Sequence, residues 1–332
     1  MNIGVLGSGS WGTTLAVLLA NNSHKVTLWT HKEEYLQMML TNRENTAFLA
    51  GITIPPSIKI TGNIFEASRN QQMVVLAVPA QFLRSVLEKI RSENFPSTIF
   101  VNVSKGIETT TLKTMSQMIA EVFPKHNTNF ISTLSGPSHA EEVSTYIPTA
   151  VVAAAKSRET ISAIQQTFGT DFFRVYVSDD LLGVELGGSL KNIIAIGAGI
   201  VEGAGFGDNT KAALMSGGLM EITQLGVAMG AKEKTFYGLT GVGDLFVTCT
   251  SKHSRNRYVG EQLGKGRKWE FIYREMEMVA EGVATTRSAY SLAKKYNIET
   301  PIINEVYKII FEGKNVHDAA KDLLSGITTE EC

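Results

Sequence analysis

The sequence lacks the features that mark a disulfide-rich, nucleic-acid-binding or zinc-dependent protein. Only Cys249 and Cys332 are cysteines among 332 residues, too few for a disulfide framework or a cysteine metal site. The 31 basic and 32 acidic residues nearly balance, so no large basic surface is available for nucleic acid or an anionic membrane. None of the six histidines pairs with another at helical i,i+4 spacing, so no zinc helix is expected, and we expect no metal site. A reducing compartment suits this sparing use of cysteine.

The N-terminus and the apolar runs predict a cytoplasmic protein. Met1 is followed directly by strand-like residues, without the basic segment or the cleavage site of a signal peptide. The most apolar helical stretch, IIAIGAGIV at residues 193–201, is too short to cross a bilayer. We therefore expect no membrane insertion.

The first half of the chain alternates short apolar runs with amphipathic segments. Several runs are continuously apolar, as is typical of strands that are covered on both faces. Alternation of strands with helices predicts an α/β fold with a doubly wound, mostly parallel sheet, here called a Rossmann domain. The expected strands are residues 3–6, 25–29, 73–78, 98–103, 129–134, 150–155 and 172–177, and the expected helices are 10–22, 81–90 and 111–123.

After Ser178 the apolar pattern changes from strand to helix. Residues 179–201, 209–230 and 288–297 have helical spacing, and little of the remainder indicates a strand. We expect two domains, a dinucleotide-binding Rossmann domain at 1–180 and an all-helical domain at 181–332. The helical domain is expected to carry the substrate and catalytic groups.

A glycine pattern follows the first predicted strand. Gly7, Gly9 and Gly12 form GxGxxG between this strand and a helix. The first glycine permits a tight turn, the second lets the backbone approach a pyrophosphate, and the third lets the helix pack on the strand. A tight turn without a ligand is the alternative, but the strand, turn and helix in register favour a bound dinucleotide.

The end of the second strand bears on the choice of cofactor. An NAD site usually has Asp or Glu there to bind the ribose 2′-hydroxyl, whereas this strand ends in Trp29, Thr30, His31 and Lys32. Polar and cationic groups at this position favour acceptance of NADP(H). An ordinary solvated loop is the alternative.

Two later strand ends carry polar residues where ligands of open α/β sheets bind. Lys105 follows the strand at 98–103, and Gly136 and Ser138 follow the strand at 129–134. Lys105 is either a solvated charge or a group that holds an anionic or carbonyl substrate.

Lys191 interrupts an otherwise apolar helical run. A lysine there either extends its ammonium group to solvent or is buried, and a buried lysine is paired or neutral, which suits catalysis. Downstream, Asp244 lies in a glycine-rich turn. Residues 253–257, HSRNR, combine a guanidinium with neutral donors and form either a phosphate site or an exposed polar loop.

Over nearly its whole length, the sequence resembles the bacterial-type NAD(P)-dependent glycerol-3-phosphate dehydrogenases. The resemblance lies in GSGSWG (7–12), VSKGIE (103–108), SGPSHAEEV (135–143), LGGSLKNIIAIGAG (186–199), GFGDNTKAAL (205–214), GLTGVGDLFVTCTSKHSRNR (238–257) and VAEG (279–282). His139 departs from the family pattern, in which Phe is common.

The resemblance implies a role for each matching residue. Lys191 is implied to be the catalytic acid/base. The implied substrate contacts are Lys105, Gly136, Ser138, Lys191, Asp244, Ser254, Arg255 and Asn256. The implied contacts of NADP(H) or NAD(H) are Gly7, Gly9, Ser10, Trp11, Gly12, His31, Lys105, Ala140, Arg255, Val279 and Glu281.

The implied reaction interconverts dihydroxyacetone phosphate and sn-glycerol 3-phosphate, which feeds glycerophospholipid synthesis. The resemblance also suggests a homodimer. A related β-hydroxyacid or phosphosugar dehydrogenase and a non-catalytic NADP(H) sensor are the alternatives. The first needs a different substrate pocket, and the second shows no turnover.

Overall fold

A computed structural model describes residues 1–326 of the chain, and Cys332 lies outside these described residues. The chain divides into two compact units. The first comprises Met1–Lys105 and Thr114–Glu185, and the second comprises Gly106–Lys113 and the chain from Leu186 onward. The segment 106–113 thus belongs to the helical unit, although it lies within the Rossmann half of the sequence.

The first unit is built on an eight-stranded sheet, and all seven expected strands are confirmed. The strand order is β10-β9-β8-β7-β6-β1-β2-β5, and every neighbouring pair is parallel except β8 with β9. The bounds are β1 (Asn2–Leu6), β2 (Lys25–Trp29), β5 (Lys59–Thr61), β6 (Met73–Leu76), β7 (Ile99–Asn102), β8 (Ile131–Ser135), β9 (Thr149–Ala155) and β10 (Phe173–Ser178).

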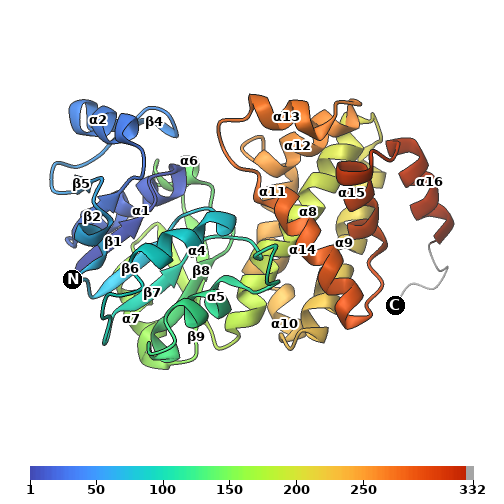
Figure 1. Ribbon diagram of the computed structural model, residues 1–332. Helices are drawn as coiled ribbons and strands as arrows, with labels where there is room; N and C mark the ends of the chain where they lie inside the picture. Colours follow the sequence, from blue (N-terminus) through green and yellow to red (C-terminus); the bar gives the residue numbers. More distant parts are fainter. Residues whose placement is uncertain (327–332) are drawn as a thin grey trace. The chain divides into compact units, whose positions relative to one another are not determined.

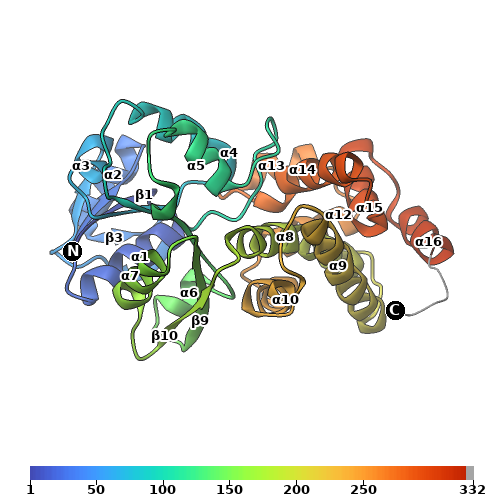
Figure 2. The same ribbon diagram turned by 90° about the horizontal axis from the view of Figure 1, so that it is seen from below.

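Helices cover both faces of this sheet, which explains why its central strands β1 and β6 are apolar and buried along nearly their whole length. Ile3 and Val5 of β1 pack on the face covered by α1 and α7, whereas Val74 and Leu76 of β6 pack on the face covered by α3, α4 and α5. Figure 2 shows these two helical layers with the sheet between them. The helices are α1 (Ser10–Asn21), α2 (Glu33–Asn42), α3 (Ile64–Ser68), α4 (Ala80–Lys89), α5 (Met115–Val122), the 3-10 turn η1 (Thr128–Phe130), α6 (Ala140–Val143) and α7 (Arg158–Phe168).

Three short strands lie in a stretch for which the sequence predicted none. β3 (Glu44–Asn45) and β4 (Leu49–Thr53) form a separate antiparallel pair, and β5 is an edge strand of the main sheet. With two and three residues, β3 and β5 are too short to show a period of their own.

The second unit is helical, as expected, and residues 179–326 contain no strand. Figure 1 shows this part of the chain from yellow-green to red. The bounds are α8 (Leu181–Gly203), α9 (Asp208–Ala228), α10 (Glu233–Phe236), η2 (Leu239–Gly243), α11 (Asp244–Thr250), α12 (Arg255–Gly264), α13 (Trp269–Glu275), α14 (Glu281–Tyr296), α15 (Pro301–Tyr307), η3 (Lys308–Glu312) and α16 (Val316–Gly326); η2 and η3 are π-helical turns.

Helix α8 corrects one expectation. Residues 193–201 were expected to be too short to cross a bilayer, but they belong to a helix of 23 residues that is long and apolar enough to do so. All of its most apolar window is buried inside the protein. We therefore assign α8 as a core helix.

Helices α8 and α12 approach one another closely through glycine. A Cβ atom built on Gly260 of α12 would lie 1.9 Å from the carbonyl oxygen of Ile196. A Cβ on Gly199 of α8 would lie 2.0 Å from the carbonyl oxygen of Arg257. Because no side chain fits at either position, the two backbones are in direct contact.

Candidate active site

The glycine-rich turn of the first unit has the geometry that a dinucleotide requires. Gly7 has a φ of +113°, and a Cβ on Gly12 would lie 1.9 Å from the carbonyl oxygen of Gly7. A Cβ on Gly9 would meet no atom within 4 Å. Gly7 and Gly12 are thus required by the turn itself, whereas the space at Gly9 fits the close approach of a pyrophosphate to the backbone.

Two residues in the first turn of α1 were expected to contact the cofactor. Ser10 is the first residue of the helix and is buried. Trp11 is half-buried, with its ring centroid 6.4 Å from that of Phe173 on β10. The turn of α1 contains no acidic residue, so its N-terminus carries no carboxylate that would repel a phosphate.

The end of β2 presents cationic and polar groups near the surface. His31 and Lys32 are both exposed, and the ammonium group of Lys32 lies 3.4 Å from the carboxylate of Glu34. Partial burial and the neighbouring charge of Lys32 lower the pKa of His31, although Glu34 opposes this. Near neutral pH, His31 is therefore mainly a neutral donor or acceptor.

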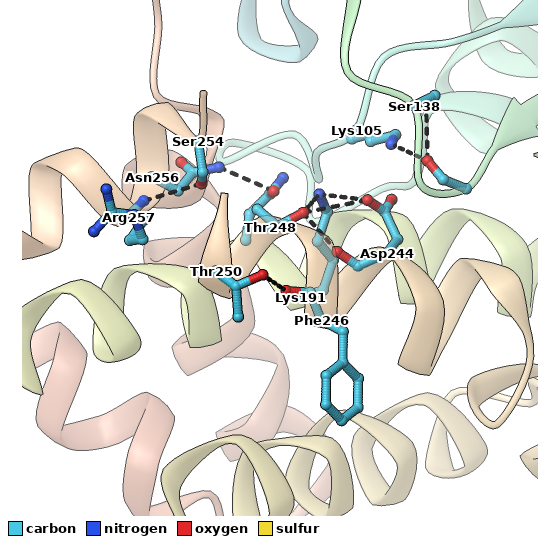
Figure 3. Close-up of polar contacts among 12 residues, drawn as sticks. Lys105, Ser138, Lys191, Asp244, Phe246, Thr248, Thr250, Ser254, Asn256 and Arg257 are labelled. Carbon is cyan, nitrogen blue, oxygen red and sulfur yellow. Dashed lines mark hydrogen bonds and ion pairs between the residues drawn. The ribbon is translucent and has the colours of Figure 1, made fainter. Parts of the chain in front are cut away.

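The structure brings together the two other strand ends of the first unit. The ammonium group of Lys105, after β7, donates to the carbonyl oxygen of Gly136, after β8, at 2.8 Å. The hydroxyl of Ser138 donates to the same oxygen at 2.9 Å, as the dashed lines in Figure 3 show. Gly136 has a φ of +139°, which favours glycine. Ala140 begins α6 four residues after Gly136 and is buried.

Within the second unit, Lys191 is buried and paired. Its ammonium group lies 2.9 Å from a carboxylate oxygen of Asp244 and 2.5 Å from the hydroxyl of Thr248 (Figure 3). The side chains of Lys191 and Asp244 are only 6% and 2% exposed. The alternative of a lysine that extends to solvent is therefore wrong. A buried ion pair is weak evidence of added stability, and its place in the core makes Lys191 a candidate functional group.

Thr248 is a member of this cluster that the sequence analysis missed. Its hydroxyl donates to the backbone carbonyl of Asp244 at 2.6 Å, one turn earlier on α11. The spacing of four residues on a helix was the signal available in the sequence. The π-helical turn η2 directly precedes Asp244, and such turns are frequent at functional sites.

The HSRNR segment forms the start of α12 rather than an exposed loop. The hydroxyl of Ser254 accepts from the backbone N–H of Arg257 at 3.2 Å and so caps the helix. Arg255 is the exposed first residue of α12. Asn256 is buried, donates to the side-chain oxygen of Asn192 at 2.9 Å and accepts from the backbone N–H of Gly282 at 2.9 Å.

The two remaining predicted residues lie beside this network. Glu281 begins α14, directly before Gly282, and Val279 is 39% exposed in the preceding segment. Asn256 therefore links the start of α14 to α8, next to Lys191.

Within the described residues 1–326, no group of three or more His, Cys, Asp and Glu side chains is arranged to hold a metal ion.

The mostly parallel sheet carries an open glycine turn, and the helical unit buries a lysine–aspartate pair. This combination is what an NAD(P)-dependent dehydrogenase needs. Comparison with known proteins gives the family. The profile described as NAD-dependent glycerol-3-phosphate dehydrogenase N-terminus matches residues 2–161, and the corresponding C-terminus profile matches residues 180–321. The chain belongs to the NAD-dependent glycerol-3-phosphate dehydrogenase family.

Individual relatives agree with this assignment. Glycerol-3-phosphate dehydrogenase [NAD(P)+] of Chlorobium phaeobacteroides (strain BS1) is 49% identical over 325 residues, covering 98% of this chain and 97% of the relative. The protein of that name from Thermoanaerobacter sp. (strain X514) is 50% identical over 325 residues, with the same coverage. The solved structure of glycerol-3-phosphate dehydrogenase from Coxiella burnetii has a TM-score of 0.93 and 32% identity, covering 97% of this chain and 98% of that one.

Proposed function

We propose that the protein catalyses reversible hydride transfer between NADPH or NADH and dihydroxyacetone phosphate, giving sn-glycerol 3-phosphate. The observation that carries the proposal is the buried cluster of Lys191, Asp244 and Thr248, in a chain that matches both halves of this dehydrogenase family. Residues 1–180 are proposed to bind the dinucleotide, and residues 181–332 to carry the acid/base.

Lys191 is proposed to move the proton of the reaction. When bound, the reduced nicotinamide supplies a hydride to the ketone carbon, and the ketone oxygen then requires a proton. The ammonium group of Lys191 stabilises the negative charge on that oxygen and donates the proton to it. In the opposite direction, the amine accepts the proton from the alcohol. Asp244 and Thr248 accept two hydrogen bonds from the ammonium group and so orient it.

The remaining predicted residues are proposed to bind and orient the two ligands. Lys105, Gly136 and Ser138 hold the substrate, together with Asp244, Ser254, Arg255 and Asn256. Gly7, Gly9, Ser10, Trp11, Gly12, His31, Ala140, Val279 and Glu281 hold the cofactor, and Lys105 and Arg255 contact both. The hydrogen-bonded unit of Lys105, Ser138 and Gly136 supports this assignment, because one lysine and one hydroxyl are fixed on the same backbone oxygen.

Arg255 is proposed to bind the phosphate of the substrate. Its guanidinium is exposed at the N-terminus of a ten-residue helix, where an anion is favoured. We expect Arg255→Ala to raise the KM for dihydroxyacetone phosphate, with a loss of about 1.5–3 kcal/mol of binding. Reduction of dihydroxyacetone, which has no phosphate and is expected to be a poor substrate, should change little. Steady-state kinetics with both substrates measure the difference, and equal losses would indicate a structural or cofactor role.

Cofactor choice provides the direct test of the activity. Because β2 ends without an acidic residue, NADPH should be used at least as well as NADH. The measurement is the loss of reduced-nicotinamide absorbance with dihydroxyacetone phosphate and each cofactor in turn. His31→Asp should shift kcat/KM towards NADH, because it places an anion beside the 2′-phosphate. A strong wild-type preference for NADH would contradict the cofactor assignment, and no turnover with either cofactor would favour the NADP(H) sensor.

We further propose that the enzyme acts in the cytoplasm as a homodimer and supplies glycerol 3-phosphate for glycerophospholipid synthesis. The burial of α8 in the protein core is compatible with this location. Analytical ultracentrifugation tests the oligomeric state, and a monomer at assay concentrations would contradict that part of the proposal.

A further inference from the structure

The side chain of Asn45 lies against the glycine-rich turn of the first unit. Asn45 belongs to β3, outside the main sheet, and is fully buried. Its amide nitrogen donates to the carbonyl oxygen of Ser8 at 2.7 Å and to the hydroxyl of Thr13 at 2.8 Å. Both acceptors belong to the segment that joins β1 to the first turns of α1. Because a carbonyl oxygen only accepts hydrogen bonds, the amide nitrogen of Asn45 must face Ser8.

The bond to Ser8 controls the direction of the next backbone N–H group. In a trans peptide, the C=O of Ser8 and the N–H of Gly9 point in opposite directions, and the described chain contains no cis peptide. Holding the Ser8 oxygen towards Asn45 therefore directs the Gly9 N–H away from Asn45. Gly9 is the N-cap residue of α1, where backbone N–H groups bind anions, and it has open space beside it.

The hydrogen-bond pattern of Asn45 favours a role in function over a role in stability. Both hydrogens of the Asn45 side-chain amide bond to the turn. The buried side-chain oxygen of Asn45 makes no hydrogen bond within the described part of the chain. Leaving a buried acceptor unpaired is costly, and an apolar residue of similar shape would avoid that cost. The hydrogen bonds of Asn45 are therefore explained better by the orientation that they impose on the glycine-rich turn than by a gain in stability.

We propose that Asn45 is a positioning residue for cofactor binding, which acts through Ser8 to orient the Gly9 N–H group towards the pyrophosphate of the dinucleotide. The proposal rests on the proposed use of NADP(H) or NAD(H). Orienting a donor before the ligand arrives removes part of the ordering cost of binding. Asn45 itself touches neither the cofactor nor the substrate in this proposal.

Asn45→Ala should weaken NADH binding about tenfold, as expected for loss of a buried hydrogen-bonding group. The measurement is the dissociation constant from fluorescence titration of the full chain without substrate. At saturating NADH, kcat should fall far less than the dissociation constant rises. Asn22→Ala is the matched control, because Asn22 also donates its amide to a backbone oxygen of this unit, that of Thr167, at 3.0 Å. A folded Asn45→Ala protein that binds NADH as the wild type does would overturn the proposal.

Asn45→Asp separates hydrogen-bond donation from packing, because the two side chains have nearly the same shape. Burial raises the pKa of a carboxyl group, so at low pH the introduced acid is protonated and donates to the Ser8 oxygen. When ionised at high pH, it repels that oxygen. The ratio of mutant to wild-type dissociation constants should therefore rise with pH, whereas a pure packing role predicts a constant ratio and would contradict the proposal. Because binding is measured without substrate, a wild type inactive on dihydroxyacetone phosphate would refute the proposed reaction and leave this test intact.

Discussion

Lys191→Ala should lower kcat by about 10²–10⁴-fold, the range typical of removing a general acid/base. The ammonium group is the proposed source of the proton for the substrate oxygen, and alanine has no proton to donate. NADPH binding should remain near that of the wild type, because Lys191 is not among the proposed cofactor contacts. The measurements are steady-state kcat and fluorescence titration of NADPH.

The stability of this variant needs its own control. Lys191→Ala leaves the carboxylate of Asp244 buried without its ion-pair partner, and such a loss typically costs about 3–5 kcal/mol. The double variant Lys191→Met with Asp244→Asn removes both charges. It should recover much of the thermal stability but none of the activity. This outcome would separate the chemical role of the lysine from its structural role.

Substitution by arginine is a further control on proton transfer. Lys191→Arg keeps a positive charge, but a guanidinium hardly releases its proton near neutral pH. It should therefore not restore kcat. If a folded Lys191→Ala enzyme kept a kcat near that of the wild type, Lys105 would be the next candidate for the acid.

The sequence predicted the main sheet well because each central strand carries its own signal. Residues 73–78 are continuously apolar and residues 98–103 are mostly so, and the strands β6 and β7 lie within these ranges with helices on both faces. The prediction failed where secondary structure depends on contacts distant in the sequence. Asn45 is buried by its contact with the turn near Ser8, 37 residues earlier, and nothing in its neighbours signals this.

The extent of the apolar stretch in α8 was underestimated for a related reason. Glu185, Lys191 and Asn192 break the apolar run of α8, so the sequence alone shows a short hydrophobic stretch. In the structure each of the three has a polar partner that compensates its burial. Ser116 donates to Glu185, Asp244 pairs with Lys191, and Asn256 donates to Asn192. A hydropathy pattern cannot anticipate these partners.

For the candidate site, the sequence predicts candidate residues, but not the contacts that connect them. Lys191 was recognised as an exception in an apolar run, and Asp244 was recognised in its glycine-rich turn. Their pairing joins positions 53 residues apart, so only the packing of α8 against α11 reveals it. Ser254 and Asn256 were expected to be substrate donors, and the structure adds that they also cap α12 and link three helices.

Gly260→Val should produce a loss of stability comparable with that of Lys191→Ala. A Cβ at this position would lie 1.9 Å from the carbonyl oxygen of Ile196 and 2.8 Å from its carbonyl carbon, and backbone atoms cannot move aside as a flexible side chain does. Helices α8 and α12 must therefore separate. Overpacking of this kind costs about 3 kcal/mol or more, which corresponds to a fall in Tm of roughly 6–12 °C. Thermal melting by circular dichroism measures it.

The same variant should also impair catalysis in the fraction that remains folded. Separation of α12 from α8 lengthens the 2.9 Å hydrogen bond between Asn256 and Asn192. Asn192 directly follows Lys191 in the chain, so this change disturbs the surroundings of the proposed acid/base. We expect kcat/KM for dihydroxyacetone phosphate to fall at temperatures well below the midpoint of unfolding. Gly238→Ala is the matched control, because a Cβ there meets its nearest atom at 3.4 Å, an ordinary contact distance. If Gly260→Val melted like Gly238→Ala, the close contact of the two helices would not be a constraint on the fold, and the orientation of Asn256 would have to come from α14 alone.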